Sequence, residues 1–79
     1  MRTRKLYAVI AFDTTDQAMR AKTVLEGAQI QGRLIPLPPV IDAGCGLAWR
    51  SEIADKERAA EVLGADGCGY KSVNEVMLF

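Results

Sequence analysis

The sequence predicts an α+β fold in which four strands and two helices follow one another in the order βαββαβ. Four short apolar runs contain β-branched or aromatic residues, which is typical of strands. Between the first and second runs, and again between the third and fourth, apolar residues recur at helical spacing. With 79 residues, of which 49% are hydrophobic, the chain has material for one small core. We therefore expect a single domain over residues 1–79, with a basic tail at residues 1–4.

The first half of the chain contains two predicted strands and a helix. Residues 5–12 form an apolar run that reads as a buried strand. Thr14 and Gln17 have the spacing of a capping box. Over residues 15–28 apolar residues then recur at helical spacing with charged residues between them, which predicts a helix. Residues 33–37 form a second strand, and Pro36 places it at a sheet edge because proline cannot donate a ladder hydrogen bond.

The second half repeats the same strand–helix–strand order. Residues 47–51 alternate as a strand in which Leu47 and Trp49 should share one face. Asp55 can cap a short second helix that Gly64 stops, and residues 70–79 form the last strand. This element order, in a chain of this length, predicts a ferredoxin-like sandwich: a four-stranded antiparallel sheet of order 4-1-3-2 with both helices on one face.

Composition excludes several classes of function. Ten basic and ten acidic residues cancel, so the chain has no overall field that would attract nucleic acid. No apolar run approaches the length of a membrane span, so we expect no membrane partner. The absence of histidine removes the usual general base and the usual zinc ligand. Two cysteines are too few for a small secreted disulfide scaffold, which favours a reduced, cytoplasmic protein.

The two cysteines, each within a Gly-Cys-Gly triplet, are the candidate reactive groups. The predicted topology brings both triplets to one end of the sheet, beside the start of the first helix, where unpaired N–H groups favour a thiolate. Flanking glycines predict exposed, uncrowded sulfur, and the alternative is that a free cysteine is simply a small buried apolar residue. A metal site that adds Asp13 or Asp42 lacks both a CxxC pair and histidine, so we expect no metal and no cofactor. The candidate site residues are Cys45, Cys68, Gly44, Gly46, Thr14 and Thr15.

The stretch LIPLP at residues 34–38, followed by GCGLA at residues 44–48, resembles the selenium/sulfur carrier protein-like family of small domains. The resemblance extends from about Tyr7 to about Tyr70. It implies a cytoplasmic protein, not an enzyme, that accepts a persulfide or selenosulfide on Cys45 and passes it to a partner. A cysteine desulfurase is the donor that such a carrier would need. The chain departs from the family's usual loop, with Pro39 in place of a basic residue and Asp42-Ala43-Gly44 before the cysteine.

Two alternatives use the same features differently. A non-enzymatic interaction module would dimerise or hold a partner through the sheet face without helices and through residues 76–79. A thiol redox switch would close a reversible disulfide between Cys45 and Cys68. In the carrier interpretation Cys68 could instead act as a resolving thiol. Since no helix covers one sheet face and the chain ends in an apolar run, we also expect a homodimer.

Overall fold

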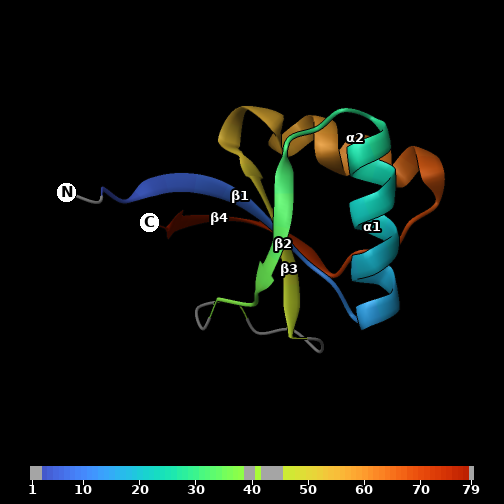
Figure 1. Cartoon of the computed structure of the whole chain (residues 1–79), viewed down its shortest axis with the longest axis horizontal. Coiled ribbons are helices and arrows are strands. Elements are labelled where there is room, and N and C mark those ends of the chain that lie inside the picture. The colour runs from blue at the N-terminus through green and yellow to red at the C-terminus, as the bar shows by residue number, and fades with distance from the viewer. Residues whose placement is uncertain (1–2, 39–40, 42–45, 79) are drawn as a thin grey trace.

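The computed structural model describes residues 3–38, 41 and 46–78 of the chain. Gly44 and Cys45, two of the candidate site residues, lie outside this part. In chain order the elements are β1 (Lys5–Ala11), α1 (Thr15–Gly27), β2 (Gly32–Pro36), β3 (Leu47–Glu52), a 3₁₀ turn (Ile53–Asp55), α2 (Lys56–Asp66) and β4 (Ser72–Leu78), as Figure 1 shows. The βαββαβ order is therefore as predicted.

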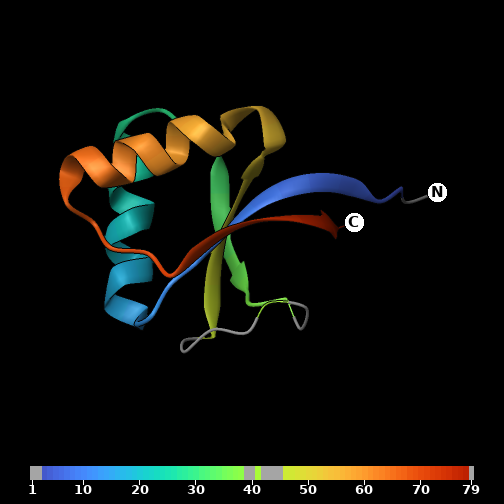
Figure 2. The ribbon, with the colours of Figure 1, turned by 180° about the vertical axis from the view of Figure 1, so that it is seen from behind.

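The four strands form one antiparallel sheet in the order β2-β3-β1-β4. Read from the β4 edge, this order is β4-β1-β3-β2. Pro36 lies at the end of β2, which pairs only with β3 and so forms an edge of the sheet. Both helices lie on the same side of the twisted sheet, which is visible from the front and from behind (Figures 1 and 2). The predicted α+β class, with a four-stranded antiparallel sheet and two helices, is confirmed.

The main core lies between the sheet and the two helices. Its largest fully buried side chains are Trp49, Phe12, Ile10, Leu25 and Leu63. The prediction that Leu47 and Trp49 share a face is confirmed, because both pack into this cluster. The burial of such aromatic and aliphatic groups is the main source of stability for a chain this small.

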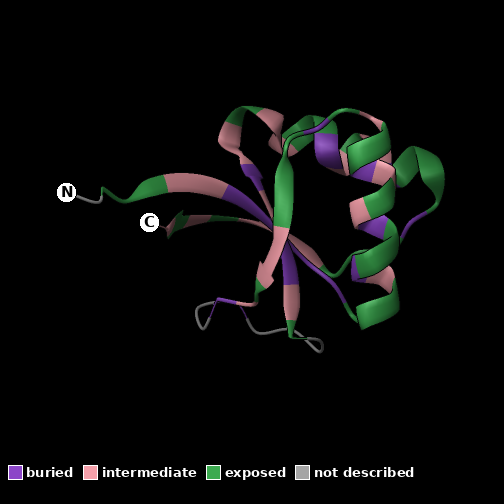
Figure 3. Ribbon diagram, viewed as in Figure 1, coloured by how far each residue is buried: buried purple, intermediate pink, exposed green. Residues whose placement is uncertain are grey.

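A second, smaller cluster lies on the face of the sheet that carries no helix. Val9, Ala11 and Ala48 are fully buried there, and Ile41 and Leu37 pack against them. The sequence led us to expect a sheet face that no helix covers, and both helices do lie on the other side of the sheet. Leu37 and Ile41, which follow β2, shield the centre of this face, where β1 and β3 contain buried stretches coloured purple in Figure 3.

The second helix ends later than the sequence predicts. It runs to Asp66, and Gly67, not Gly64, ends it with φ of 75°. A positive φ strains any residue with a Cβ atom, whereas a glycine inside a helix costs only about 1 kcal/mol. Asp55 stands at the N-cap position as predicted, but its side chain makes no capping bond because the 3₁₀ turn leads directly into the helix.

Candidate functional site

One end of the sheet gathers the segments that flank both cysteines. Ala11, at the end of β1, pairs with Ala48 near the start of β3 and with Ser72 at the start of β4. The Lys71 N–H also donates to the Ala11 carbonyl at 2.7 Å. The end of β1 therefore lies at the same end of the sheet as Gly46, which follows Cys45. The loop that contains Cys68 also lies at this end, as the topology predicts.

The segment that contains Cys45 is tied to the sheet at its described residues. The Leu37 N–H donates to the Gly46 carbonyl at 2.9 Å, which joins the two ends of the segment. The Ile41 N–H donates to the Pro38 carbonyl at 3.0 Å, and the Ile41 side chain is only 9% exposed. Gly46 is exposed, and a Cβ atom there would meet nothing within 4 Å. The chain next to Cys45 is thus anchored through Ile41 and open to solvent at Gly46.

The start of α1 has the capping arrangement that the sequence predicts. The Thr14 Oγ1 accepts from the Gln17 N–H at 3.1 Å, and the Gln17 Oε1 accepts from the Asp13 N–H at 3.0 Å. Thr14 and Thr15 are both exposed. The first turn of a helix has unpaired N–H groups and a partial positive charge, which stabilise an anion placed nearby.

Cys68 occupies a different environment from the one predicted. It is 5% exposed and belongs to the main core, together with Leu63 and Ala18. Its Sγ lies 3.9 Å from the Gln17 carbonyl oxygen. Burial raises the pKa of the Cys68 thiol, since the thiolate would lose its hydration there. The expectation of exposed, reactive sulfur is therefore wrong at this position.

The glycines around Cys68 serve the backbone. Gly67 adopts the positive φ that ends α2, and its N–H donates to the Gly64 carbonyl. A Cβ atom on Gly69 would lie 2.9 Å from the Gln17 Nε2, so a side chain there would displace the end of the Gln17 side chain. This turn directs Cys68 inward, so the triplet at residues 67–69 reflects a helix end packed against α1.

The described residues contain no group of three or more His, Cys, Asp or Glu side chains that could hold a metal ion. Among these same residues, neither helix has the length and apolar character needed to cross a membrane.

Sequence reasoning missed a pocket on the sheet face that carries no helix. It has a volume of about 240 Å³ and is lined by the side chains of Tyr7, Arg33, Arg50 and Glu52, among others. Arg33 and Arg50 are separated in the sequence and become neighbours only through the β2–β3 register. Tyr7 lines this pocket, whereas the Trp49 ring is fully buried in the main core.

Comparison with known protein families identifies one family to which most of the chain is similar. A family model described as "putative Se/S carrier protein-like" matches residues 7–75. The chain belongs to this family. The match includes both helices, the whole of β2 and β3, and the Cys45-Gly46 pair that carried the sequence resemblance. Searches among curated proteins and among solved structures found no match.

Proposed function

We propose that this chain carries sulfur or selenium and that Cys45 is the carrying thiol. The observation that supports this most strongly is the family match over residues 7–75, which spans the Cys45-Gly46 pair. A carrier needs one accessible thiolate and a surface for its partners, and it needs no acid–base residues of its own. The lack of histidine is therefore compatible with the proposal.

The proposed loading step is a transfer of sulfane sulfur between two thiols. The Cys45 thiolate attacks the outer sulfur of a persulfide on the donor protein, and a new S–S bond forms at Cys45. The S–S bond of the donor breaks, and the donor leaves as a thiolate. One persulfide is consumed and one is formed, so no external oxidant or reductant is needed. Selenium would follow the same course, with a selenosulfide in place of the persulfide.

The described surroundings of Cys45 suit such a step. Gly46 is exposed and has no neighbour within 4 Å of a Cβ position, so a donor protein could approach this point of the chain. Ile41 anchors the same segment to the sheet. The start of α1, with Thr14 and Thr15 exposed, lies at the same end and would favour the anionic forms of sulfur. We propose Gly44, Gly46, Thr14 and Thr15 as the residues that surround the loaded sulfur.

We further propose a cysteine desulfurase or a similar persulfide-forming protein as the donor, and the cytoplasm as the compartment. Cys68 can act as a resolving thiol only if it leaves its buried position, since its Sγ packs against α1 and its pKa is raised. The carrier step itself does not require Cys68.

The test is the intact mass of the protein after incubation with a cysteine desulfurase and cysteine. Wild type should gain about 32 Da, and dithiothreitol should remove the added mass. Cys45→Ser should gain nothing. The matched control is Cys68→Ala, which should load as wild type does; alanine is preferred to serine because a hydroxyl would be buried at that position without a planned partner. Equal loading of wild type and Cys45→Ser, or no loading of wild type, would contradict the proposal.

A further inference from the structure

The pocket beside β2 and β3 lies on the sheet face without helices, near the end of β3 and away from the exit of β1. Tyr7 pairs with Glu52 in the β1–β3 register, and Gly32 pairs with Ser51 in the β2–β3 register, which places the pocket at the sheet end opposite Gly46. Its polar lining owes nothing to the segment of Cys45. A function for this pocket is therefore independent of the proposed carrier chemistry.

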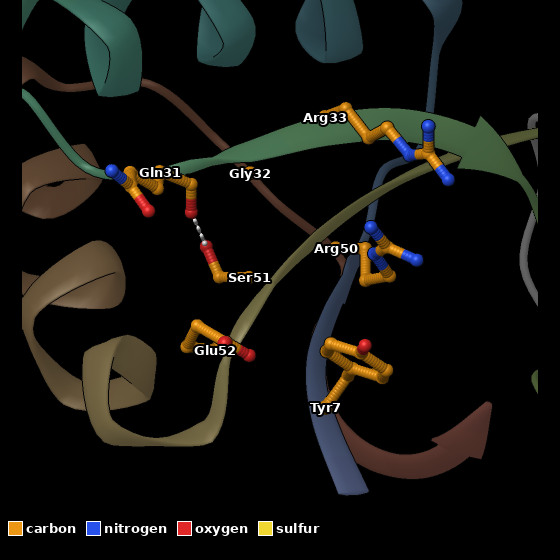
Figure 4. A pocket seen from close by; sticks show the side chains of 7 residues that line it. All are labelled: Tyr7, Gln31, Gly32, Arg33, Arg50, Ser51 and Glu52. Carbon is orange, nitrogen blue, oxygen red and sulfur yellow. Dashed lines mark hydrogen bonds between the residues drawn. The ribbon is translucent and has the colours of Figure 1, made fainter. Parts of the chain in front are cut away.

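Two arginines face each other across the strands in this pocket. Arg33 of β2 is the direct register partner of Arg50 of β3, and Figure 4 shows their guanidinium groups next to each other. Like charges directly opposite each other in a sheet are destabilising. In the described part of the chain, no carboxylate forms an ion pair with either arginine. Within the described part of the chain, no negative charge therefore offsets the repulsion between these two arginines.

The acidic residue of the pocket is already engaged. Glu52 accepts two hydrogen bonds from the Lys5 Nζ, at 2.7 and 2.9 Å. The hydrogen bond to Glu52 also raises the pKa of Lys5. With Lys5 and Glu52 neutralising each other, the two arginines leave a local charge of +2 in a chain whose formal net charge is zero.

The position of Arg50 is fixed before any ligand arrives. Its guanidinium carbon lies 4.6 Å from the centroid of the Tyr7 ring, which is a cation–π contact. Arg50 lies between Arg33 and the Tyr7 ring, so the three side chains form a row on the same face (Figure 4). A cation held in place in this way loses less conformational freedom when it binds an anion.

We propose that Arg33 and Arg50 together bind a phosphate-class dianion, either free or as the phosphoryl group of a small molecule. Each guanidinium presents a planar fork of N–H donors that matches two oxygens of an oxyanion. Two forks on adjacent strands suit a tetrahedral group with at least three available oxygens, and a double negative charge balances the local charge of +2. A single carboxylate would engage one fork and leave the repulsion between the arginines largely in place.

The test is a titration of ¹⁵N-labelled protein with inorganic phosphate at constant ionic strength, followed by amide and arginine Nε shifts. Wild type should show saturable shifts around residues 32–33 and 50–52. Arg33→Gln and Arg50→Gln should each weaken binding about tenfold or more, the equivalent of one hydrogen-bonded charged group. The matched control is Arg58→Gln, on the outer side of α2, where the guanidinium donates to the Ala28 carbonyl and faces no pocket arginine.

Two further ligands identify the source and the selectivity. Phosphoserine that binds more tightly than inorganic phosphate would indicate a phosphomonoester, and the reverse order would indicate the free ion; either result supports the proposal. Acetate should bind at least tenfold more weakly than phosphate. Shifts that do not saturate, equal weakening in Arg58→Gln, or unchanged binding in Arg33→Gln would overturn the proposal. Arg33 is exposed, so its substitution should leave the fold intact, which a thermal melt checks.

Discussion

The replacement of Gly32 by alanine tests the packing of the sheet against the main core. A Cβ atom at Gly32 would collide with the Arg50 carbonyl oxygen and would lie 2.7 Å from Cζ2 of the Trp49 ring. Neither neighbour can move cheaply, because one is the backbone of β3 and the other is a fully buried ring. Overpacking of this kind lowers the free energy of unfolding by about 1–3 kcal/mol. Because both neighbours are rigid, we expect Gly32→Ala to lose about 3 kcal/mol.

Urea denaturation measures this cost against a matched control. With a dependence of about 1 kcal/mol per molar urea, the midpoint of Gly32→Ala should fall by about 3 M. Gly64→Ala is the control, because Gly64 lies inside α2 with nothing within 4 Å of a Cβ position. That change should stabilise the protein by about 0.5–1 kcal/mol, since alanine is the better helix former. A loss below about 0.5 kcal/mol for Gly32→Ala would refute the packing argument.

The remaining predictions concern other parts of the fold. Ser51→Ala should cost about 1–3 kcal/mol in urea denaturation because the buried Trp49 Nε1, which donates to the Ser51 Oγ at 2.7 Å, loses its acceptor; an unchanged midpoint would show that another acceptor replaces it. Ile41→Ala should cost about 2 kcal/mol, at the low end for such truncations because a loop can close the cavity, and a neutral result would contradict the anchoring role. Burial raises the pKa of the Cys68 thiol in the folded state. Its contribution to the free energy of unfolding is therefore complete below about pH 8.5, the pKa of an unfolded thiol, and is lost as the pH rises through the folded pKa. In Cys68→Ala, the urea midpoint should fall less over this alkaline range than in wild type, and an equal fall would contradict the assignment. Light scattering at high micromolar concentration should show a homodimer, given the exposed Met77 on the edge strand β4, and a monomer would contradict this.

The main elements were predictable because each has a strong local signal. Thr14 and Gln17 mark the start of α1; Thr14 caps the helix as expected, and the Gln17 side chain accepts from the Asp13 N–H, one residue before the N-cap. Pro36 places β2 at an edge for a covalent reason, since it has no N–H to donate. In both cases the residues that set the structure are neighbours in the sequence.

The environment of Cys68 could not be predicted in this way. Its Gly-Cys-Gly triplet has the same sequence as the triplet around Cys45, yet Gly67 ends a helix and turns Cys68 into the core. The two identical triplets do not reveal this difference, because the direction of the Cys68 side chain depends on the packing of α2 against α1. Gly64 misled the sequence analysis for the same reason: two glycines stand three residues apart, and only the backbone shows which one has a positive φ.

The pocket arginines were missed because strand register is a property of the folded sheet. Arg33 and Arg50 are separated by the whole β2–β3 connection, and a shift of one residue in pairing would place them on opposite faces. Pro36 paired with Leu47 is one end of this register, and nothing in the sequence alone fixes it.

The central claim is that Cys45 carries the transferred sulfur, and the most direct measurement is to locate that sulfur in wild-type protein. After loading by a cysteine desulfurase, the persulfide is alkylated and the protein is digested with trypsin. Because the lysines and arginines are placed favourably, Cys45 falls in the peptide of residues 34–50 and Cys68 in that of residues 59–71. Tandem mass spectrometry should find one additional sulfur, about 32 Da, on Cys45 and none on Cys68. An additional sulfur on Cys68 with none on Cys45, or on neither peptide, would contradict the carrier role of Cys45.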